Sequence, residues 1–371
     1  MSKRNYGIDL LRCISMMMVV VLHVMGHGKI LATVEPNSLN YNVAWFFETI
    51  AYCSVNCYAL ISGYVGIRAK YKYRNIVTLW LQVAFYTVSI ALLFQLLDPT
   101  SIDLKGILSS FFPVMSRSYW YFTSYFALFF FMPIINSGIN ALTKNDAKKL
   151  VVGIIAVFSI IRTVLCFDVF DMFNSSDLFN INNGYSVIWL MLLYIVGGCI
   201  GKFNFLKATK SWKVWTVFWL SVILSWGFKL FVELPENEEL KTVVGANSLI
   251  NYLSPTIIAT AICLLILFSR LESLPKVPQK IVGFFAPVSF AVYLIHDNSL
   301  IRNNIIAKKL SDIASLGPFE MILHVFVAVL IIYISCSLID HIRILLFKLF
   351  HVKEIIDKIA DFESLKKDIS K

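Results

Sequence analysis

The sequence predicts an all-α membrane protein with about ten transmembrane helices and with both termini in the cytoplasm. Of its 371 residues, 58% are hydrophobic, 15% are aromatic and only 15% are charged, and the mean hydropathy is +0.73. A water-soluble domain could not keep this balance in solution. The apolar residues also gather in stretches of about twenty residues, which is the length of helix that crosses a bilayer.

Ten stretches fit such a span. In chain order they are 8–26, 43–65, 76–97, 119–136, 150–167, 186–201, 214–233, 248–269, 283–299 and 320–347. The first stretch lacks the small-residue cleavage site of a signal peptide, so we expect it to remain in the protein as a helix. The sixth stretch is the shortest of the set.

Basic residues set the expected orientation. With the N-terminus inside, the basic clusters at 68–74, 144–149 and 270–280 fall on the cytoplasmic side, and the acidic cluster at 233–239 falls outside. The predicted topology therefore explains the net charge of +10, and no nucleic-acid partner is needed to account for it.

Two regions differ in character. Residues 1–350 form one transmembrane bundle, and residues 351–371 form a cytoplasmic tail whose apolar residues recur at helical spacing among lysines. We expect this tail to lie along the inner leaflet, with its lysines on anionic lipid headgroups. A partner-binding helix is the alternative. The seven cysteines are scattered singly along apolar stretches, so neither a disulfide framework nor a metal site is predicted.

The first span carries an arginine and a histidine on one helical face. Arg12 and His23 are eleven residues apart, and eleven steps of about 100° return to within roughly 20° of the starting direction. At 1.5 Å per residue the two side chains are roughly 16 Å apart along the axis, about half the thickness of the bilayer core. One is therefore expected near a membrane surface and the other deeper inside.

Ionisable residues within spans are expected to line a polar cavity or to pair, because burial at bilayer depth costs about 2.5 kcal/mol or more. The candidates are Arg12, His23, Glu48, Arg74, Arg162, His296 and Asp297. Each also has a structural interpretation. Arg12 and Arg74 can be anchors at the membrane interface. Glu48 and Arg162 can form an ion pair between helices, and Asp297 can cap a helix.

Two histidines lie near one depth in the predicted topology. His23 and His296, followed by Asp297, all fall toward the outer halves of their helices. Two imidazoles and a carboxylate in one place favour an acid/base site.

Four segments of the chain carry recognisable motifs. They are GIDLLRCISMMMVVVLHV with Arg12 and His23, CYALISGYVGIRAKYKYRNIVTLWLQVAFYTV, SYWYFTSYFALFFFMPIIN, and FAPVSFAVYLIHDNSLIR. In sequence and in order these segments resemble the acyltransferase-3 family of bacterial integral membrane O-acyltransferases. The chain departs from the family in two places. Ser118 and Tyr119 precede Trp120 where many members have a histidine, and the basic loop is spread over Arg68, Lys70, Lys72 and Arg74 instead of having two adjacent arginines.

The resemblance implies acetyl-CoA as the donor, and we expect no metal. A cluster of basic residues at the cytoplasmic side of the bundle would then bind the phosphates of the donor. Its members are Arg12, Arg68, Lys72 and Arg74. The alternative is that these residues are ordinary positive-inside charges.

The same resemblance implies roles for the residues expected near the outer ends of the helices. His23 would take the proton of an attacking hydroxyl or accept the acyl group, with His296 and Asp297 orienting or relaying. Trp120, Tyr121 and Tyr125 would form a platform for a sugar ring, or else they are membrane-interface aromatics. Arg162 would stabilise an oxyanion or pair with Glu48.

The expected function is therefore O-acetylation of a cell-surface polysaccharide or its lipid-linked precursor at the bacterial cytoplasmic membrane. The main alternative is a transporter of a glycan or lipid intermediate. A transporter more often shows inverted repeats or paired broken helices, and neither is found in this sequence. A sensor or scaffold would leave the two histidines without a shared purpose.

Overall fold

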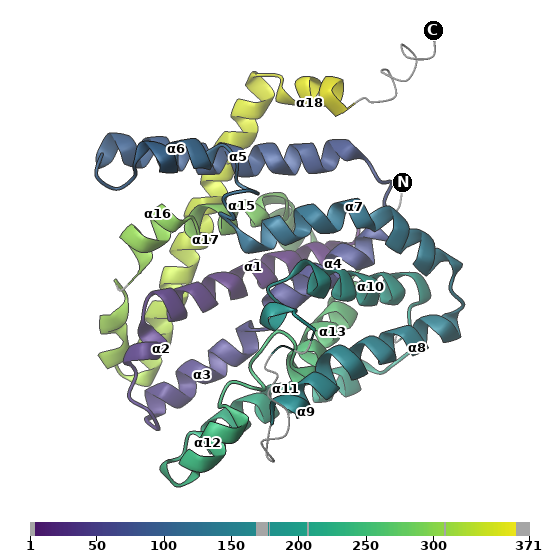
Figure 1. The fold of residues 1–371 in the computed structure, drawn as a ribbon, viewed down its shortest axis with the longest axis vertical. Helices are drawn as coiled ribbons and strands as arrows, with labels where there is room; N and C mark the ends of the chain where they lie inside the picture. The colour runs from purple at the N-terminus through teal and green to yellow at the C-terminus, as the bar shows by residue number, and fades with distance from the viewer. Residues whose placement is uncertain (1–3, 168–176, 178, 206–207, 308, 361–371) are drawn as a thin grey trace.

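The computed structural model is a bundle of helices (Figure 1), and it describes residues 4–167, 177, 179–205, 208–307 and 309–360. Within these residues there is no β-strand. The helices are α1 (Tyr6–His27), α2 (Ile30–Thr33), α3 (Leu39–Ala51), α4 (Ser54–Gly66), α5 (Tyr73–Leu97), α6 (Leu104–Ser110), α7 (Trp120–Ala141), α8 (Lys144–Ile155), α9 (Arg162–Cys166), α10 (Val187–Phe203), α11 (Ser211–Val232), α12 (Glu238–Val244), α13 (Pro255–Ser269), α14 (Lys276–Phe285), α15 (Ser289–His296), α16 (Ser299–Ile301), α17 (Pro318–Leu349) and α18 (Val352–Ala360).

Seven helical segments in the described part of the chain are long and apolar enough to cross a membrane. They are α1 with α2, α5, α7, α8 with α9, α11, α14 with α15, and α17, and α10 and α13 are shorter apolar helices. The chain is thus a multi-pass membrane protein. The expected second span is two helices of 13 residues each, α3 and α4. The count of ten spans and the orientation of the termini stay predictions.

Capping residues and prolines determine where several spans begin. The Asn5 side chain accepts a hydrogen bond from the backbone N–H of Ile8 and so caps α1. Ser186 caps α10 in the same way. Proline is well tolerated at the first helical position, and Pro255 starts α13 seven residues later than the sequence predicted. The hydropathy pattern located these spans, but local backbone chemistry fixed their ends.

Glycines let α4 and α10 pack closely. A Cβ atom at Gly63 would collide with the backbone of Tyr194, and one at Gly197 would collide with the backbone of Leu60. Small residues at such positions allow two backbones to approach, which is a common way for helices to pack in membranes. This close pair lies beside α1, which also contacts α3, α13, α15 and α17. The first helix is therefore held in the middle of the bundle.

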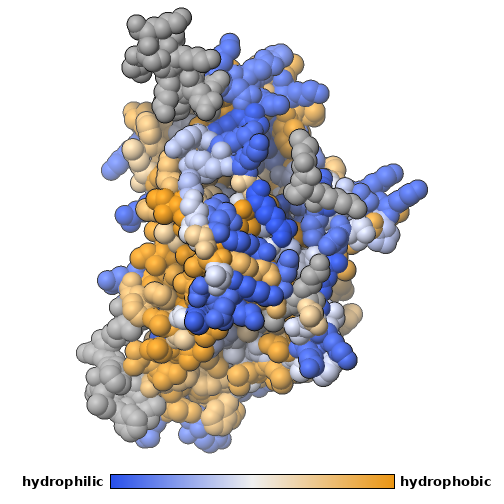
Figure 2. Space-filling model, turned by 90° about the vertical axis from the view of Figure 1, so that its right-hand side faces the viewer, coloured by the Kyte–Doolittle hydropathy of each residue, from blue (hydrophilic) through white to orange (hydrophobic). Residues whose placement is uncertain are grey.

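The outer helices present apolar side chains outward. In α11, Leu220 and Leu224 are exposed, and in α17 Ile331 and Leu345 are exposed. Exposed apolar residues of this extent suit a lipid environment. Figure 2 views the molecule from the right-hand side of Figure 1, and hydrophilic residues gather across this end, with hydrophobic residues along one flank. The N-terminus lies at this end, and α2 and α12 lie at the opposite end (Figure 1).

The first part of the predicted tail forms α18, which packs along α5. Asp357 of α18 accepts a hydrogen bond from Arg74 of α5 at 2.9 Å. Ile356 is buried, whereas Ile355 is exposed. Residues 361–371 of the tail lie outside the described residues, and its contact with lipid stays a prediction.

Candidate active site

Two cavities lie along α1. One lies beside the first half of α1 and is called the inner cavity, because the predicted orientation places it toward the cytoplasm. It has a volume of about 450 Å³ and is lined by Arg4, Asp9, Arg12, Tyr64 and Arg68 together with neighbouring residues. The outer cavity, of about 220 Å³, lies toward the other end of the helix. Its lining includes His23, His27, Asp297, Arg302 and a group of aromatic side chains. Arg12 and His23 therefore belong to different cavities joined by one helix.

The inner cavity holds three guanidinium groups. Asp9 lies between two of them, because its carboxylate accepts a hydrogen bond from Arg4 at 2.6 Å and another from Arg12 at 2.8 Å. The hydrogen bond to Asp9 raises the pKa of the Arg4 guanidinium. Arg68 donates to the backbone carbonyl of Gly201. The cavity is therefore cationic overall, and arginine side chains with fixed geometry are suited to binding phosphate groups.

Two residues of the basic cluster expected to bind the donor phosphates lie elsewhere. Arg74 pairs with Asp357 of α18, and neither Arg74 nor Lys72 is part of the cavity lining that the structure describes. The sequence grouped them with Arg68 because the four basic residues are close along the chain. In three dimensions α5 begins at Tyr73, directly after this loop. Of the four basic residues, only Arg68 lines the inner cavity together with Arg12.

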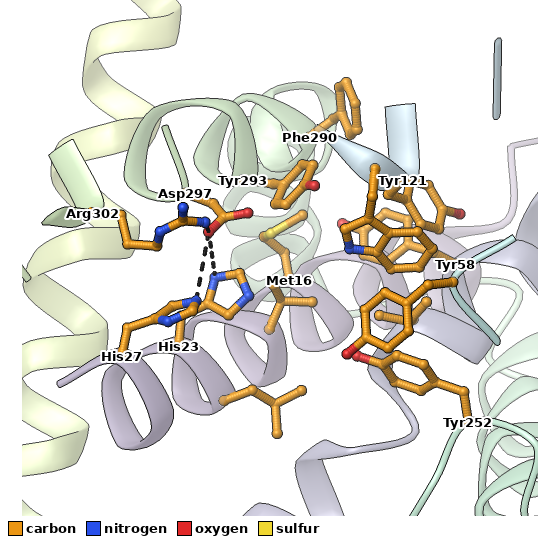
Figure 3. A pocket seen from close by; sticks show the side chains of 15 residues that line it. Met16, His23, His27, Tyr58, Tyr121, Tyr252, Phe290, Tyr293, Asp297 and Arg302 are labelled. Carbon is orange, nitrogen blue, oxygen red and sulfur yellow. Dashed lines mark hydrogen bonds and ion pairs between the residues drawn. The ribbon is translucent and has the colours of Figure 1, made fainter. Parts of the chain in front are cut away.

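The outer cavity has a polar side and an aromatic side. In Figure 3, His23, His27, Asp297 and Arg302 lie together at one side, and the rings of Tyr121 and Tyr252 lie at the other. His23 and His27 come from α1, Asp297 directly follows the end of α15, and Arg302 directly follows the end of α16. The cavity therefore brings a titratable cluster to face an aromatic wall.

A chain of hydrogen bonds fixes the tautomers of the two histidines. His296 is 2% exposed, and its Nδ1 lies 2.6 Å from the carbonyl oxygen of Val292. A carbonyl oxygen can only accept, so Nδ1 of His296 carries the hydrogen, and Nε2 of the neutral ring has a lone pair. That Nε2 lies 2.9 Å from Nδ1 of His23, which must therefore donate. Neutral His23 thus has its free lone pair on Nε2, the nitrogen that Figure 3 shows turned away from Asp297.

Asp297 is the centre of the charges at the polar side. Its Oδ1 lies 3.1 Å from Arg302, 3.7 Å from Nδ1 of His23 and 3.8 Å from Nε2 of His27. Asp297 is the C-cap residue of α15, and its side chain in addition faces Arg302 and the two histidines, so capping is not its only contact. An imidazolium formed at His23 would lie near this carboxylate, and the carboxylate would stabilise it.

The aromatic side contains only part of the predicted platform. Trp120 and Tyr121 line the cavity, whereas Tyr125 stacks behind Tyr121 with ring centroids 6.4 Å apart. Tyr185 and Tyr252, which the sequence did not single out, complete the wall. Their centroids lie 4.6 Å and 6.3 Å from that of Trp120. Aromatic rings of this kind can stack on an apolar face of a sugar.

Glu48 and Arg162 do not form the predicted ion pair. The Arg162 guanidinium donates to the side-chain oxygen of Asn183 at 2.5 Å. Glu48 is buried on α3, and the cation whose charge acts on it is Lys229 of α11. Neither residue belongs to the lining that the structure describes for either cavity. Their positions on separate helices could not be read from the spans alone.

Three polar residues of the site escaped the sequence reasoning. His27 lies four residues after His23, and a one-turn spacing on the same helix was the signal that could have found it. Arg302 lies five residues after Asp297 within the last segment quoted above, so proximity in the chain was its signal. Tyr58 gave none. Its hydroxyl donates to the backbone carbonyl of Arg12 at 3.0 Å while its ring lines the outer cavity, and it thus lies between the two cavities.

One comparison with known proteins identifies the family. A family model described as an acyltransferase domain matches residues 5–341 of the 371. Apart from Arg4, every residue that lines the two cavities lies within this range. Comparisons with curated proteins and with solved structures found no significant match.

Proposed function

The chain belongs to the acyltransferase-3 family, and on this premise we propose that it is an O-acetyltransferase of the bacterial cytoplasmic membrane. The donor is cytoplasmic acetyl-CoA, and the acceptor is a hydroxyl of a cell-surface polysaccharide or of its lipid-linked precursor. The single observation that carries the proposal is the hydrogen-bond chain from Val292 through His296 to His23. This chain leaves a basic nitrogen at the outer cavity.

The inner cavity is the proposed binding site of the donor phosphates. Arg4, Arg12 and Arg68 supply the positive charge there, and Asp9 holds two of the guanidinium groups in place. Charge-assisted hydrogen bonds to phosphate contribute more than neutral ones. The thioester end of acetyl-CoA then reaches from this cavity toward His23, roughly 16 Å along α1.

Tyr58 lies on this route. Passage of the donor arm requires the Tyr58 hydroxyl to leave the Arg12 carbonyl, which breaks one hydrogen bond. A typical hydrogen bond contributes about 1 kcal/mol net, so binding of the donor can offset this cost.

The transfer step uses His23 as a general base. Nε2 takes the proton of the acceptor hydroxyl as its oxygen attacks the thioester carbonyl. The thiolate of CoA leaves, and it receives the proton from His23. The new imidazolium keeps its Nδ1–H on His296 and lies 3.7 Å from Asp297, and both contacts stabilise the positive charge. An alternative step in which His23 accepts the acyl group uses the same lone pair.

The acceptor sugar is proposed to lie against the aromatic wall. Trp120, Tyr185 and Tyr252 face the polar side across the cavity. Stacking of an apolar sugar face on these rings would direct one hydroxyl toward Nε2 of His23.

The test uses protein purified in detergent with labelled acetyl-CoA and a surface glycan. We expect release of free thiol with transfer of label to the glycan. His23→Gln should abolish both, and His324→Gln, which changes an exposed histidine of α17, should affect neither. Full transfer by His23→Gln would refute the mechanism, and label that never reaches any glycan would refute the acceptor class.

A further inference from the structure

Three side chains at the polar side of the outer cavity have the geometry of metal ligands. One ligand atom each from His23, His27 and Asp297 lies within 4.8 Å of the other two. The carboxylate Oδ1 is nearly equidistant from the two imidazole nitrogens, at 3.7 Å and 3.8 Å. Zinc bonds of about 2.0–2.1 Å in a tetrahedron place two ligands roughly 3.4 Å apart. Small side-chain rotations would therefore bring all three atoms to zinc distance.

The spacing of the two histidines supports this geometry. His23 and His27 are four residues apart on α1, and their ring centroids lie 4.9 Å apart. Two histidines at this spacing on one helical face are a common bidentate arrangement for zinc. The His27 side chain is 40% exposed, so an ion can reach the cluster from the surface.

Arg302 would compete with such an ion for the carboxylate of Asp297. Its guanidinium lies 3.1 Å from the same Oδ1 that would bind the metal. A divalent ion and a guanidinium repel each other, so metal binding must move Arg302 away from this oxygen. The ion pair consequently weakens metal binding, and its removal should strengthen it.

Metal binding would also change the tautomer of His23. The nitrogen of His23 nearest Asp297 is Nδ1, which donates its hydrogen to His296 in the metal-free protein. A metal ligand must offer a lone pair, so the hydrogen must leave Nδ1. The neutral ring then carries its hydrogen on Nε2, and Nε2 can no longer accept a proton.

From these contacts we propose that His23, His27 and Asp297 form a three-ligand inhibitory site for a divalent transition-metal ion of the zinc type. The fourth position faces the cavity and takes water. The ion is not a cofactor, because its binding removes the basic lone pair of His23. The inhibition rests on the proposed function, whereas the binding does not.

The binding test is a titration with Co²⁺ alone, using the full chain in detergent with its affinity tag removed. We expect one Co²⁺ per chain with the visible absorption of a tetrahedral site. His27→Gln should weaken binding by at least about tenfold, because one of three protein ligands is lost. The matched control His324→Gln, on α17, should bind as the unchanged protein does.

Arg302→Gln makes the test independent of folding. This variant should bind Co²⁺ more tightly than the unchanged protein, and a merely damaged protein would not do so. Unchanged binding in His27→Gln, or weaker binding in Arg302→Gln, would overturn the site.

The activity test adds Zn²⁺ to the labelled transfer assay. Zn²⁺ should inhibit transfer, and a chelator should restore it. If Co²⁺ binds as expected but Zn²⁺ leaves transfer unchanged, the inhibitory role is refuted. If the protein transfers no acyl group without metal, the proposed function fails, and the Co²⁺ titration still decides the site.

Discussion

Replacement of His296 by phenylalanine tests the tautomer argument most directly. Phenylalanine fills a similar space but cannot accept the hydrogen on Nδ1 of His23. Because His296 is 2% exposed, water cannot readily take its place. The tautomer of His23 that can act as a base carries its hydrogen on Nδ1. In the variant this N–H group has lost its hydrogen-bond partner, which costs about 1–3 kcal/mol. The fraction of protein in the competent form should fall accordingly.

The expected result is a kcat lower by roughly 5- to 150-fold, since each tenfold corresponds to about 1.4 kcal/mol. The KM for acetyl-CoA should change little, because the donor phosphates bind in the inner cavity. His296→Gln should recover part of the rate, since its amide oxygen can accept the hydrogen from His23. The assay is steady-state transfer of labelled acetyl groups in detergent.

The control is His341→Phe, which replaces a histidine of α17 that packs on Phe284, outside both cavities. This variant should keep its kcat. A His296→Phe protein with unchanged kcat would refute the reasoning, and so would a His296→Gln protein no better than His296→Phe. Thermal unfolding of each variant separates a loss of rate from a loss of folded protein.

Three further outcomes follow from the geometry. Arg12→Gln should raise the KM for acetyl-CoA by roughly 10- to 150-fold, because a charge-assisted hydrogen bond contributes about 1.5–3 kcal/mol, whereas Arg74→Gln, outside the cavity, should not change it. Trp120→Ala should raise the KM for the glycan by roughly 3- to 10-fold through lost ring contact, and an unchanged value would exclude Trp120 from the acceptor site. Gly63→Ala should destabilise the protein by about 1–3 kcal/mol, because its methyl group would collide with the backbone of α10, as thermal unfolding would report. The control Gly227→Ala meets no atom within 4 Å and should be neutral or slightly stabilising.

Local patterns in the sequence predicted much of the fold. The apolar stretches located the helices, because hydropathy depends on each segment by itself. The break between α3 and α4 was missed, since the 43–65 stretch is mostly apolar and carries no proline or glycine at residues 52 and 53. The late start of α13 was also missed, because the apolar pattern extends ahead of Pro255.

Two residues of the candidate site were found from their spacing on one helix. Arg12 and His23 lie on α1 at a spacing that fixes their relative direction, and the structure places them in two different cavities. The destination of Arg74 was not predictable in this way. Its partner Asp357 is 283 residues further along the chain, and no local pattern links the two.

The sequence by itself determined that the chain spans a membrane, that it belongs among the acyltransferases, and that one helix carries both an arginine and a histidine. These features are local, because hydropathy, motif order and helical phase are set by neighbouring residues. Only the tertiary structure decided which groups meet, because His23 and His296 are 273 residues apart and their contact depends on how α1 packs against α15. That contact fixes the hydrogen on one nitrogen of His23 and leaves the other free to react.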